Sequence, residues 1–380
     1  MHPSCMRAVL VGYCRTPFHR AHRGDLRETR PEDMAATVVR GLLERTKISP
    51  DTIEDLLIGC AYPEGEQGLN IGRMTTYLAG LPDSVPGMTT NRLCGSSMQV
   101  IHTAAGSISM GSGEAFICAG VETMSRVMRG GFNRDLHPHI EEQYPAAYIG
   151  MGTTAENLAI SHNISRGQQE EFAANSHHKA IHATRSGFLK DEIVNVGEVT
   201  LDGCMREPDL EKMSQLKPAF SDDGTVTAAT SSPLTDGAAG ILVCSEDFAL
   251  QHGLEPIASI VSTAVAGVPP EIMGYGPVPA SKKALKRSGL TLDDMSIIEL
   301  NEAFSAQSLA CLQDMSVDPE DERLNIDGGA LAIGHPLGAS GCRIVGKASD
   351  LLSRLQGEYA LATMCIGGGM GISTVLERWN

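Results

Sequence analysis

An internal duplication constrains the fold of this chain more than any other feature. The order strand, helix, strand occurs twice, first at 7–11, 31–43 and 55–59 and again at 257–261, around 280–286 and at 295–300. A glycine-punctuated loop, a helix and an apolar strand then follow in each copy, ending at 115–120 and at 359–365. Apolar strands that alternate with helices are typical of parallel α/β layers, so the pattern predicts a duplicated α/β domain.

The stretch between the two copies has a different character. From about 121 to 223 it is polar, contains Met and His, and carries charged helical runs such as 166–174. We interpret it as an inserted loop or lid domain. The N-terminal half is then 1–120, completed by about 224–255, and the C-terminal half is 256–380. Four basic residues of the insertion are candidate partners for a phosphorylated ligand, or else part of a solvated surface: Arg126, Arg129, Arg134 and Lys217.

Composition excludes several classes of function. A formal net charge of -16 disfavours non-specific nucleic-acid binding, which depends on clustered Lys and Arg. No apolar run approaches the roughly 20 residues of a membrane span, and the first residues lack the pattern of a secretion or import signal, so we expect a cytoplasmic protein. Ten cysteines without a C-x-x-C pair fit a reducing compartment, and most of them lie in apolar runs typical of the core.

One cysteine lies where a nucleophile would be expected. In residues 89–105 an extended segment meets Cys94 and then the small-residue start of a helix. A thiol at a helix N-terminus faces unpaired N–H groups and the positive end of the helix dipole, which stabilise the reactive thiolate. The sequence therefore predicts that Cys94 is a nucleophile, with a buried structural cysteine as the alternative.

Three further motifs carry chemistry. The glycine-rich loop 325–344 contains His335, a candidate general base or a structural histidine, and it lacks both common nucleotide-binding patterns. A strand runs into Cys365 and then into glycines whose N–H groups can form an oxyanion hole. Asn301 and Glu302 place an amide and a carboxylate at the end of a strand, just before a helix.

Together these motifs resemble the thiolase family, in the family's order and along essentially the whole chain. The matching signatures are Asn-Arg-Leu before Cys-Gly-Ser-Ser-Met at 94–98, Asn-Glu-Ala-Phe at 301–304, Gly-His-Pro-Leu-Gly-Ala-Ser-Gly at 334–341 and Cys-Ile-Gly-Gly-Gly-Met-Gly at 365–371. The resemblance implies a thiolase fold, an α/β structure with a duplicated five-layered αβαβα core and an inserted loop domain.

The resemblance also implies a division of labour among these residues. Cys94 is the acyl-accepting nucleophile, His335 activates it, and Cys365 handles the proton on the substrate α-carbon. Cleavage of a carbon–carbon bond β to a thioester leaves an enolate, so attack and protonation need separate groups. His335 with a water held by Asn301 would stabilise one oxyanion, and the N–H groups of Cys94 and Gly367 the other. Glu302 would order the histidine loop.

The family's ligand contacts carry over in the same way. Ser232 would contact the pantetheine arm of coenzyme A, with Met151, Ala303 and Phe304 lining its tunnel and Lys217 among the binding candidates. Coenzyme A would act as a co-substrate, and no bound cofactor or metal is implied. The partners implied are acyl-CoA substrates and CoA, with no nucleic acid.

One departure from the short-chain members points to a subfamily. They carry a histidine immediately before Met-Gly-x-Thr-Ala-Glu-Asn, where this chain has Gly150, so we expect a wider acyl site. Together, Gly150 and the segments 66–71, 91–94 and 272–277 make the chain similar to the 3-ketoacyl-CoA thiolase subunit of bacterial fatty-acid oxidation complexes. That subfamily implies a homodimer or tetramer, dimerising through the N-terminal halves, and a partner subunit with hydratase and dehydrogenase activities.

Three alternatives remain at this point. A biosynthetic acetyl-CoA acetyltransferase would condense two acetyl-CoA molecules. A condensing enzyme of fatty-acid or polyketide synthesis would carry histidine or asparagine in place of Cys365. A non-catalytic acyl-CoA carrier on the same fold would have lost a catalytic residue, and none is missing.

Overall fold

The computed structural model describes residues 6–379. The N-terminal half consists of these helices and strands: β1 (Ala8–Arg15), β2 (His19–Arg20), α1 (Pro31–Thr46), β3 (Asp55–Gly59), α2 (Ile71–Ala79), β4 (Gly87–Thr90), α3 (Ser96–Met110), β5 (Ala115–Thr123), β6 (Thr235–Ser245) and α8 (Glu246–Gln251). The C-terminal half consists of β7 (Ala258–Gly267), α9 (Pro277–Ser288), β8 (Met295–Leu300), α10 (Ser305–Met315), α11 (Ala330–Ile333), α12 (Ser340–Leu355), β9 (Tyr359–Ile366) and β10 (Met370–Arg378).

The two halves repeat one sheet topology. The strand order is β4-β3-β5-β6-β1 in the first half and β8-β9-β10-β7 in the second. In the first half β3 and β5 are parallel, and β5 pairs with β6 in the antiparallel direction. In the second half β8 and β9 are parallel, and β9 pairs with β10 in the antiparallel direction. The place of β4 is taken in the second half by an isolated parallel bridge between Ile298 and Leu324. Within the sheet, two residue pairs of β1 and β7 join the described parts of the halves, Val9 with Ser259 and Leu10 with Ala258.

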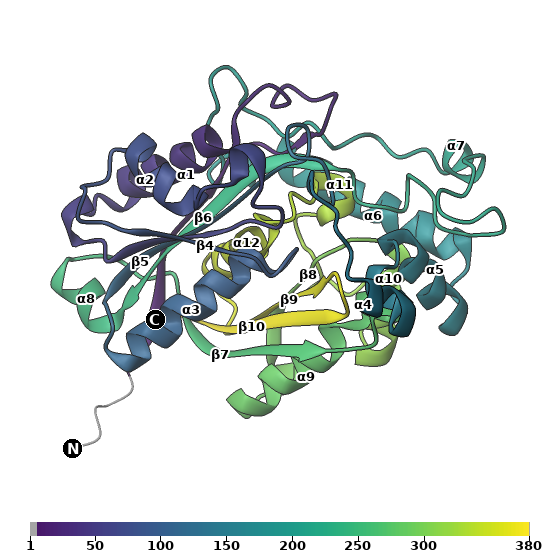
Figure 1. The fold of residues 1–380 in the computed structure, drawn as a ribbon. Coiled ribbons are helices and arrows are strands. Elements are labelled where there is room, and N and C mark those ends of the chain that lie inside the picture. The colour runs from purple at the N-terminus through teal and green to yellow at the C-terminus, as the bar shows by residue number, and fades with distance from the viewer. Residues whose placement is uncertain (1–5, 380) are drawn as a thin grey trace.

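The layers are visible in Figure 1, where α3 and α12 lie between the two sheet portions while α1 and α2 cover one outer face and α9 the other. Three apolar clusters fill the spaces between these layers. The three apolar residues in the middle of β3 are buried on both faces of the sheet: Leu57 packs in the central cluster, and Leu56 and Ile58 pack in the outer one. The predicted duplicated αβαβα architecture is confirmed.

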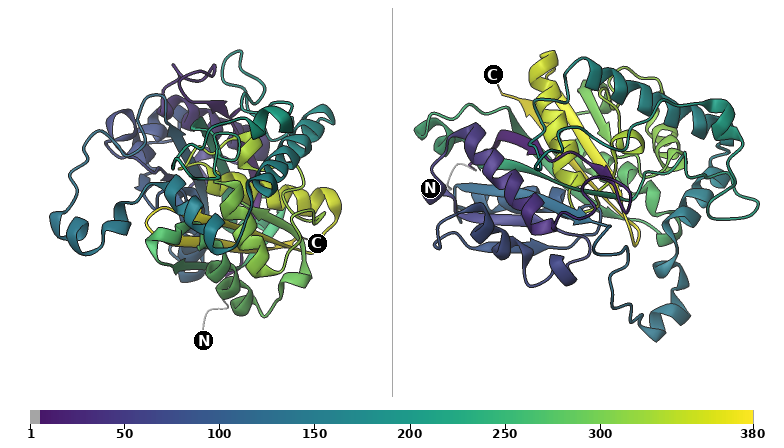
Figure 2. Two further views of the ribbon diagram at one scale, coloured as in Figure 1. Left: turned by 90° about the vertical axis from the view of Figure 1, so that its right-hand side faces the viewer. Right: turned by 90° about the horizontal axis from the view of Figure 1, so that it is seen from above.

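The regular elements of the segment between β5 and β6 are helices joined by long loops. It contains α4 (Pro138–Gln143), α5 (Met151–Ser161), α6 (Arg166–Arg185) and α7 (Leu210–Ser214). Helix α6 begins at a capping box in which Ser165 and Gln168 satisfy each other's backbone N–H groups. Helices α5 and α6 contact α10, and α6 contacts α11, so the insertion packs on the C-terminal half. Both views of Figure 2 show the part that carries α4 extending away from the halves.

Strand β5 continues to Thr123 and pairs with β6 over its whole length. The first three residues of the predicted insertion, 121–123, therefore lie in the sheet. Within residues 6–379 no helix is long and apolar enough to cross a bilayer.

Candidate active site

A cavity of about 410 Å³ collects most of the predicted site residues. It opens where α3 begins and where β8 and β9 end, so both halves and the insertion contribute to its wall. Eleven of the residues singled out in the sequence line it: Cys94, Arg129, Arg134, Gly150, Met151, Ser232, Ala303, Phe304, His335, Cys365 and Gly367. Asn301 reaches the site through His335, whereas Lys217 is exposed and is not part of the wall.

A tight turn presents Cys94 to the cavity. Leu93 has a positive φ of 46°, a conformation that costs energy for a branched side chain. Two side chains hold it there: Asn91 Oδ1 accepts a hydrogen bond from the Leu93 N–H at 2.8 Å, and the Ser96 hydroxyl donates to the Leu93 carbonyl at 2.6 Å. Helix α3 begins at Ser96, two residues after the cysteine. The turn therefore fixes the thiol at the edge of the helix N-terminus.

The resting thiol of Cys94 is neutral. Burial raises the pKa of Cys94 to about 11, although backbone hydrogen bonds from Gly367 and from Cys94 itself lower it. The backbone N–H groups therefore favour the thiolate, but in the free site the loss of solvation outweighs them. The same two N–H groups point to the Cys94 sulfur, beside the place where the oxygen of an acyl group on this sulfur would lie.

His335 is held in one tautomer by its surroundings. The Ser340 hydroxyl donates to the Pro336 carbonyl at 3.0 Å, so it accepts a hydrogen bond from His335 Nδ1 at 2.6 Å. This leaves Nε2 as the acceptor, 3.4 Å from the Asn301 amide nitrogen. Burial lowers the pKa of His335 to about 3, and the positive charge of Arg343 contributes to this decrease. A neutral imidazole with a free Nε2 lone pair is suited to accept a proton.

The motif that delivers His335 is anchored by residues that the sequence reasoning did not single out. Besides Ser340, Thr235 at the start of β6 accepts the His335 backbone N–H at 3.0 Å. The serine lies in the same Gly-His-Pro-Leu-Gly-Ala-Ser-Gly signature as the histidine, five residues on, so its spacing was a usable signal. Thr235 lies 100 residues away, and no local pattern marks it.

Asn301 and Glu302 follow β8 directly, as predicted. Asn301 Oδ1 is buried and has no hydrogen-bond partner among residues 6–379, so it can accept a hydrogen bond at the edge of the site. The Glu302 carboxylate accepts hydrogen bonds from Ser176 at 2.6 Å, Asn325 at 2.7 Å and the Leu331 N–H at 3.2 Å. Glu302 thereby ties the insertion to the loop that leads to His335.

A second buried carboxylate joins the two halves beside the site. Glu122 at the end of β5 accepts hydrogen bonds from the Ala61 N–H at 2.8 Å, from Gln67 at 2.7 Å and from the Gly338 N–H of the histidine loop at 2.9 Å. The approach is close enough that a Cβ at Gly120 would lie 2.1 Å from the Gly338 carbonyl oxygen. Glycine is required there because any side chain would separate the halves.

Cys365 lines the same cavity as the nucleophile Cys94. It is almost the last residue of β9 and is 1% exposed. Burial raises the pKa of Cys365 well above its ordinary value, and the charge of a Cys94 thiolate raises it further. A neutral thiol of this kind can donate a proton, and it donates more readily once the neighbouring sulfur carries no charge.

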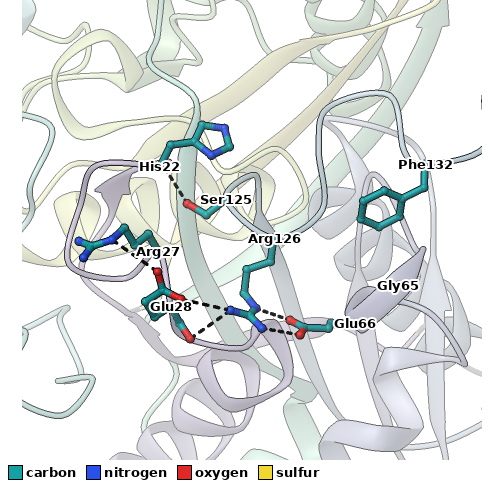
Figure 3. A pocket seen from close by; sticks show the side chains of 8 residues that line it. All are labelled: His22, Arg27, Glu28, Gly65, Glu66, Ser125, Arg126 and Phe132. Atoms are coloured by element: carbon teal, nitrogen blue, oxygen red, sulfur yellow. Dashed lines mark hydrogen bonds and ion pairs between the residues drawn. The ribbon is translucent and has the colours of Figure 1, made fainter.

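The basic residues of the insertion separate into two groups. Arg129 and Arg134 line the catalytic cavity. Arg126 instead points to a different pocket, shown in Figure 3, where it forms an ion pair with Glu66. Arg126, one of the four candidate partners for a phosphorylated ligand, is therefore paired outside the catalytic cavity, and a ligand-binding role for it stays a prediction.

Comparison with known families agrees with this geometry. The thiolase N-terminal domain matches residues 8–247 and the thiolase C-terminal domain matches residues 254–378. The chain therefore belongs to the thiolase family of acyltransferases.

Particular relatives can be named. The chain is 48% identical to a 3-ketoacyl-CoA thiolase of Idiomarina loihiensis, covering 97% of this chain and 99% of the relative, and 47% identical to one of Vibrio vulnificus with the same coverage. Among solved structures, human mitochondrial 3-ketoacyl-CoA thiolase is similar with a TM-score of 0.91 at 34% identity, covering 99% of this chain and 100% of that one. The acetyl-CoA acetyltransferase of Bacillus anthracis has a TM-score of 0.90 at 34% identity, with the same coverage.

Proposed function

We propose that this protein is a 3-ketoacyl-CoA thiolase, which uses coenzyme A to cleave a 3-ketoacyl-CoA into acetyl-CoA and a shortened acyl-CoA in fatty-acid β-oxidation. The observation that carries this proposal is the convergence of Cys94, His335 and Cys365 on one cavity. Full-length relatives at 46–48% identity bear the same name, and human mitochondrial 3-ketoacyl-CoA thiolase has been solved in complex with CoA.

In the first half-reaction Cys94 Sγ attacks the 3-keto carbon while His335 Nε2 takes the thiol proton. The bond between carbons 2 and 3 breaks, its electron pair remains as the enolate of acetyl-CoA, and Cys365 protonates carbon 2. Acetyl-CoA leaves, and the shortened acyl group stays on Cys94 as a thioester. In the second half-reaction Cys365 takes the proton of the CoA thiol, the CoA sulfur attacks the thioester, and Cys94 recovers its proton from His335.

Two oxyanions form along this route. The Cys94 and Gly367 N–H groups, which already act on the Cys94 sulfur, stabilise the acyl-enzyme oxyanion. His335 and a water held by the unpartnered Asn301 Oδ1 stabilise the thioester oxygen of the CoA substrate. Ser232, Met151, Ala303 and Phe304 contact the pantetheine arm along the cavity, and Lys217 lies outside it as a candidate for the CoA phosphates.

A biosynthetic acetyl-CoA acetyltransferase is the rival function, and the similarity to the Bacillus anthracis enzyme keeps it open. The glycine at position 150 favours the degradative function, with longer 3-ketoacyl-CoA substrates, over the biosynthetic one. A Cβ at this position would meet only Thr153 Oγ1, at 3.6 Å, so the glycine leaves space in the cavity wall that a larger residue would fill. The test is turnover of acetoacetyl-CoA against 3-ketoacyl-CoAs of increasing length. A preference for acetoacetyl-CoA that excludes longer chains would support the rival.

The assembly and location follow from the same subfamily. We propose a homodimer or tetramer in the cytoplasm that binds a hydratase/dehydrogenase α subunit of a fatty-acid oxidation complex. We also propose three structural units, 1–120 with 224–255, 121–223 and 256–380. Light scattering of the pure chain, with and without such a subunit, tests the assembly, and a monomer in both cases would contradict it.

A further inference from the structure

A buried carboxylate without a counter-ion lies directly behind the wall of the catalytic cavity. Glu122 is fully buried, and each of its two oxygens accepts two hydrogen bonds from N–H groups. Oε1 accepts from the Tyr62 backbone at 3.3 Å and from Gln67 Nε2 at 2.7 Å. Oε2 accepts from the Ala61 backbone at 2.8 Å and from the Gly338 backbone at 2.9 Å. Among residues 6–379 no lysine, arginine or histidine forms an ion pair with this carboxylate.

The four N–H donors hold Glu122 as an anion. A protonated carboxyl group must donate its own hydrogen, but all four acceptor positions of this carboxylate already face an N–H group. Protonation would therefore set two hydrogens against each other at one of the four contacts. Burial raises the pKa of Glu122, and the hydrogen bonds oppose that rise. A buried charge without a cation is destabilising, so its presence beside the active site indicates a use in the reaction.

The contacts of Glu122 place its charge close to the nucleophile. Tyr62 and Leu337 line the cavity together with Cys94. Glu122 binds the backbone N–H of Tyr62 and the backbone N–H that follows Leu337. A Cβ two residues earlier in β5 would lie 2.5 Å from Ser97 Cβ, in the first turn of the helix that follows the nucleophile. One layer of backbone therefore separates the carboxylate from the cavity.

The wall itself supplies no negative charge, because its lining contains neither aspartate nor glutamate within the described part of the chain. The titratable side chains of the wall besides Cys94 are Tyr62, Arg129, Arg134, Tyr148, His335 and Cys365. Burial raises the pKa of Cys94 to about 11, the charge of Glu122 contributes to this rise, and the charge of Arg129 opposes it. Glu122 is therefore a negative charge that disfavours a thiolate on Cys94 in the free enzyme.

From these contacts we infer that Glu122 is a positioning residue for the reaction: it fixes the cavity wall at Tyr62 and at the histidine loop, and its charge keeps the proton on Cys94 until His335 accepts it. The inference rests on the roles proposed above for Cys94 and His335. A neutral thiol in the free enzyme is protected from alkylation and oxidation, which require the thiolate. The anchored loop meanwhile keeps Nε2 of the histidine in place to accept the proton.

The test uses two measurements on the whole enzyme. The first is the rate at which iodoacetamide alkylates Cys94 at about pH 8 without substrate, with the label located by peptide mapping, and the second is kcat/KM for thiolysis of a 3-ketoacyl-CoA. Glu122→Gln removes the charge at nearly the same volume, so alkylation should become about three- to tenfold faster because more of the thiol is ionised. Its kcat/KM should fall about tenfold or more, since an amide nitrogen cannot accept the N–H groups that a carboxylate oxygen accepts.

Two further variants separate the charge from the shape of the wall. Glu122→Asp keeps the charge but shortens the side chain by one methylene, so kcat/KM should fall while the alkylation rate stays close to that of the wild type. Gln67→Lys leaves Glu122 unchanged and replaces the amide that donates to its Oε1 by an ammonium, which compensates the charge. Alkylation should become faster in this variant too, so the role of the charge stays testable if Glu122→Gln does not fold.

Glu156→Gln is the matched control. Glu156 is also a buried carboxylate that accepts its hydrogen bonds from Thr225 and the Val226 N–H, forms no ion pair among residues 6–379 and does not line the cavity. Its substitution should leave alkylation of Cys94 unchanged.

Two results would overturn the role of the charge: unchanged alkylation in both Glu122→Gln and Gln67→Lys, or a rise in Glu122→Asp as large as in Glu122→Gln. An unchanged kcat/KM in Glu122→Gln would overturn the positioning role. Alkylation needs no substrate, so a wild-type enzyme that cleaves no 3-ketoacyl-CoA would contradict the proposed function and not the effect of Glu122 on Cys94.

Discussion

Replacing Ser340 by alanine tests whether the orientation of His335 controls reactivity. Among residues 6–379 the serine hydroxyl is the one acceptor of the His335 Nδ1 hydrogen bond, at 2.6 Å, and both residues are buried, the serine 1% and the histidine 4% exposed. In Ser340→Ala the buried Nδ1 proton loses this acceptor. A buried donor without a partner costs about 1–3 kcal/mol.

That cost falls on the tautomer that the reaction needs. With the proton moved to Nε2, the imidazole can no longer accept the proton of Cys94. At 1.36 kcal/mol for each factor of ten, a penalty of about 1–3 kcal/mol corresponds to a loss of roughly 5- to 150-fold in kcat/KM. The assay is the initial rate of thiolysis of a 3-ketoacyl-CoA, with thermal unfolding measured in parallel to separate loss of activity from loss of fold.

Ser349→Ala supplies the control within the same helix. Ser349 in α12 is also 1% exposed, and its hydroxyl donates to the Gly346 carbonyl at 2.7 Å without touching His335. Both substitutions remove a buried hydroxyl, so their effects on unfolding should be similar. Equal kcat/KM for Ser340→Ala and Ser349→Ala would refute the role given to the Ser340 hydrogen bond.

Three further predictions follow from the site. Burial lowers the pKa of His335 to about 3 and that of His177 to about 4, below the ordinary value near 6.5, so the unfolded chain binds the extra protons and the free energy of unfolding should fall as pH falls. Between about pH 6.5 and 5 the unfolding free energy should fall by about 2 kcal/mol for each histidine. Urea unfolding at several pH values should show that the unfolding free energy of His177→Gln depends less steeply on pH than that of the wild type; an equal pH dependence would count against this assignment. Gly150→His should reduce kcat/KM for long 3-ketoacyl-CoAs more than for acetoacetyl-CoA, whereas equal losses would remove the argument from this position. Cys365→Ser should slow thiolysis by about 10²-fold or more but acyl exchange between acyl-CoA and labelled CoA much less, and Cys94→Ala should abolish both; equal losses in Cys365→Ser would show that Cys365 supports the thioester step instead.

The sequence was most informative where short motifs and periodicity carry the structure. The predicted strand 295–300 coincides with β8. The repeat predicted a duplicated α/β domain, and the resemblance to the thiolase family added the αβαβα layers. Cys94, His335 and Cys365 lie in three motifs far apart in the chain, yet they line one cavity: Cys94 follows β4, His335 lies in the loop between α11 and α12, and Cys365 lies near the end of β9.

What the sequence could not give depends on contacts between distant segments. Thr235 and Glu122 position the histidine loop from the other half, and neither carries a local signal. The state of the Cys94 thiol depends on how much solvent the fold removes, which the helix N-terminus alone does not reveal. Likewise Arg126 and Arg129 look equivalent in sequence, and only the ion pair with Glu66 tells them apart.

The central claim of this account is that the reaction passes through a thioester on Cys94. Incubation of the enzyme with a 3-ketoacyl-CoA in the absence of free CoA, followed by intact-mass measurement and peptide mapping, tests it most directly. The account predicts one added acyl group, shorter by two carbons than the substrate's, on the peptide that contains Cys94. An acyl group on Cys365 instead, or turnover with no covalent adduct at all, would contradict it.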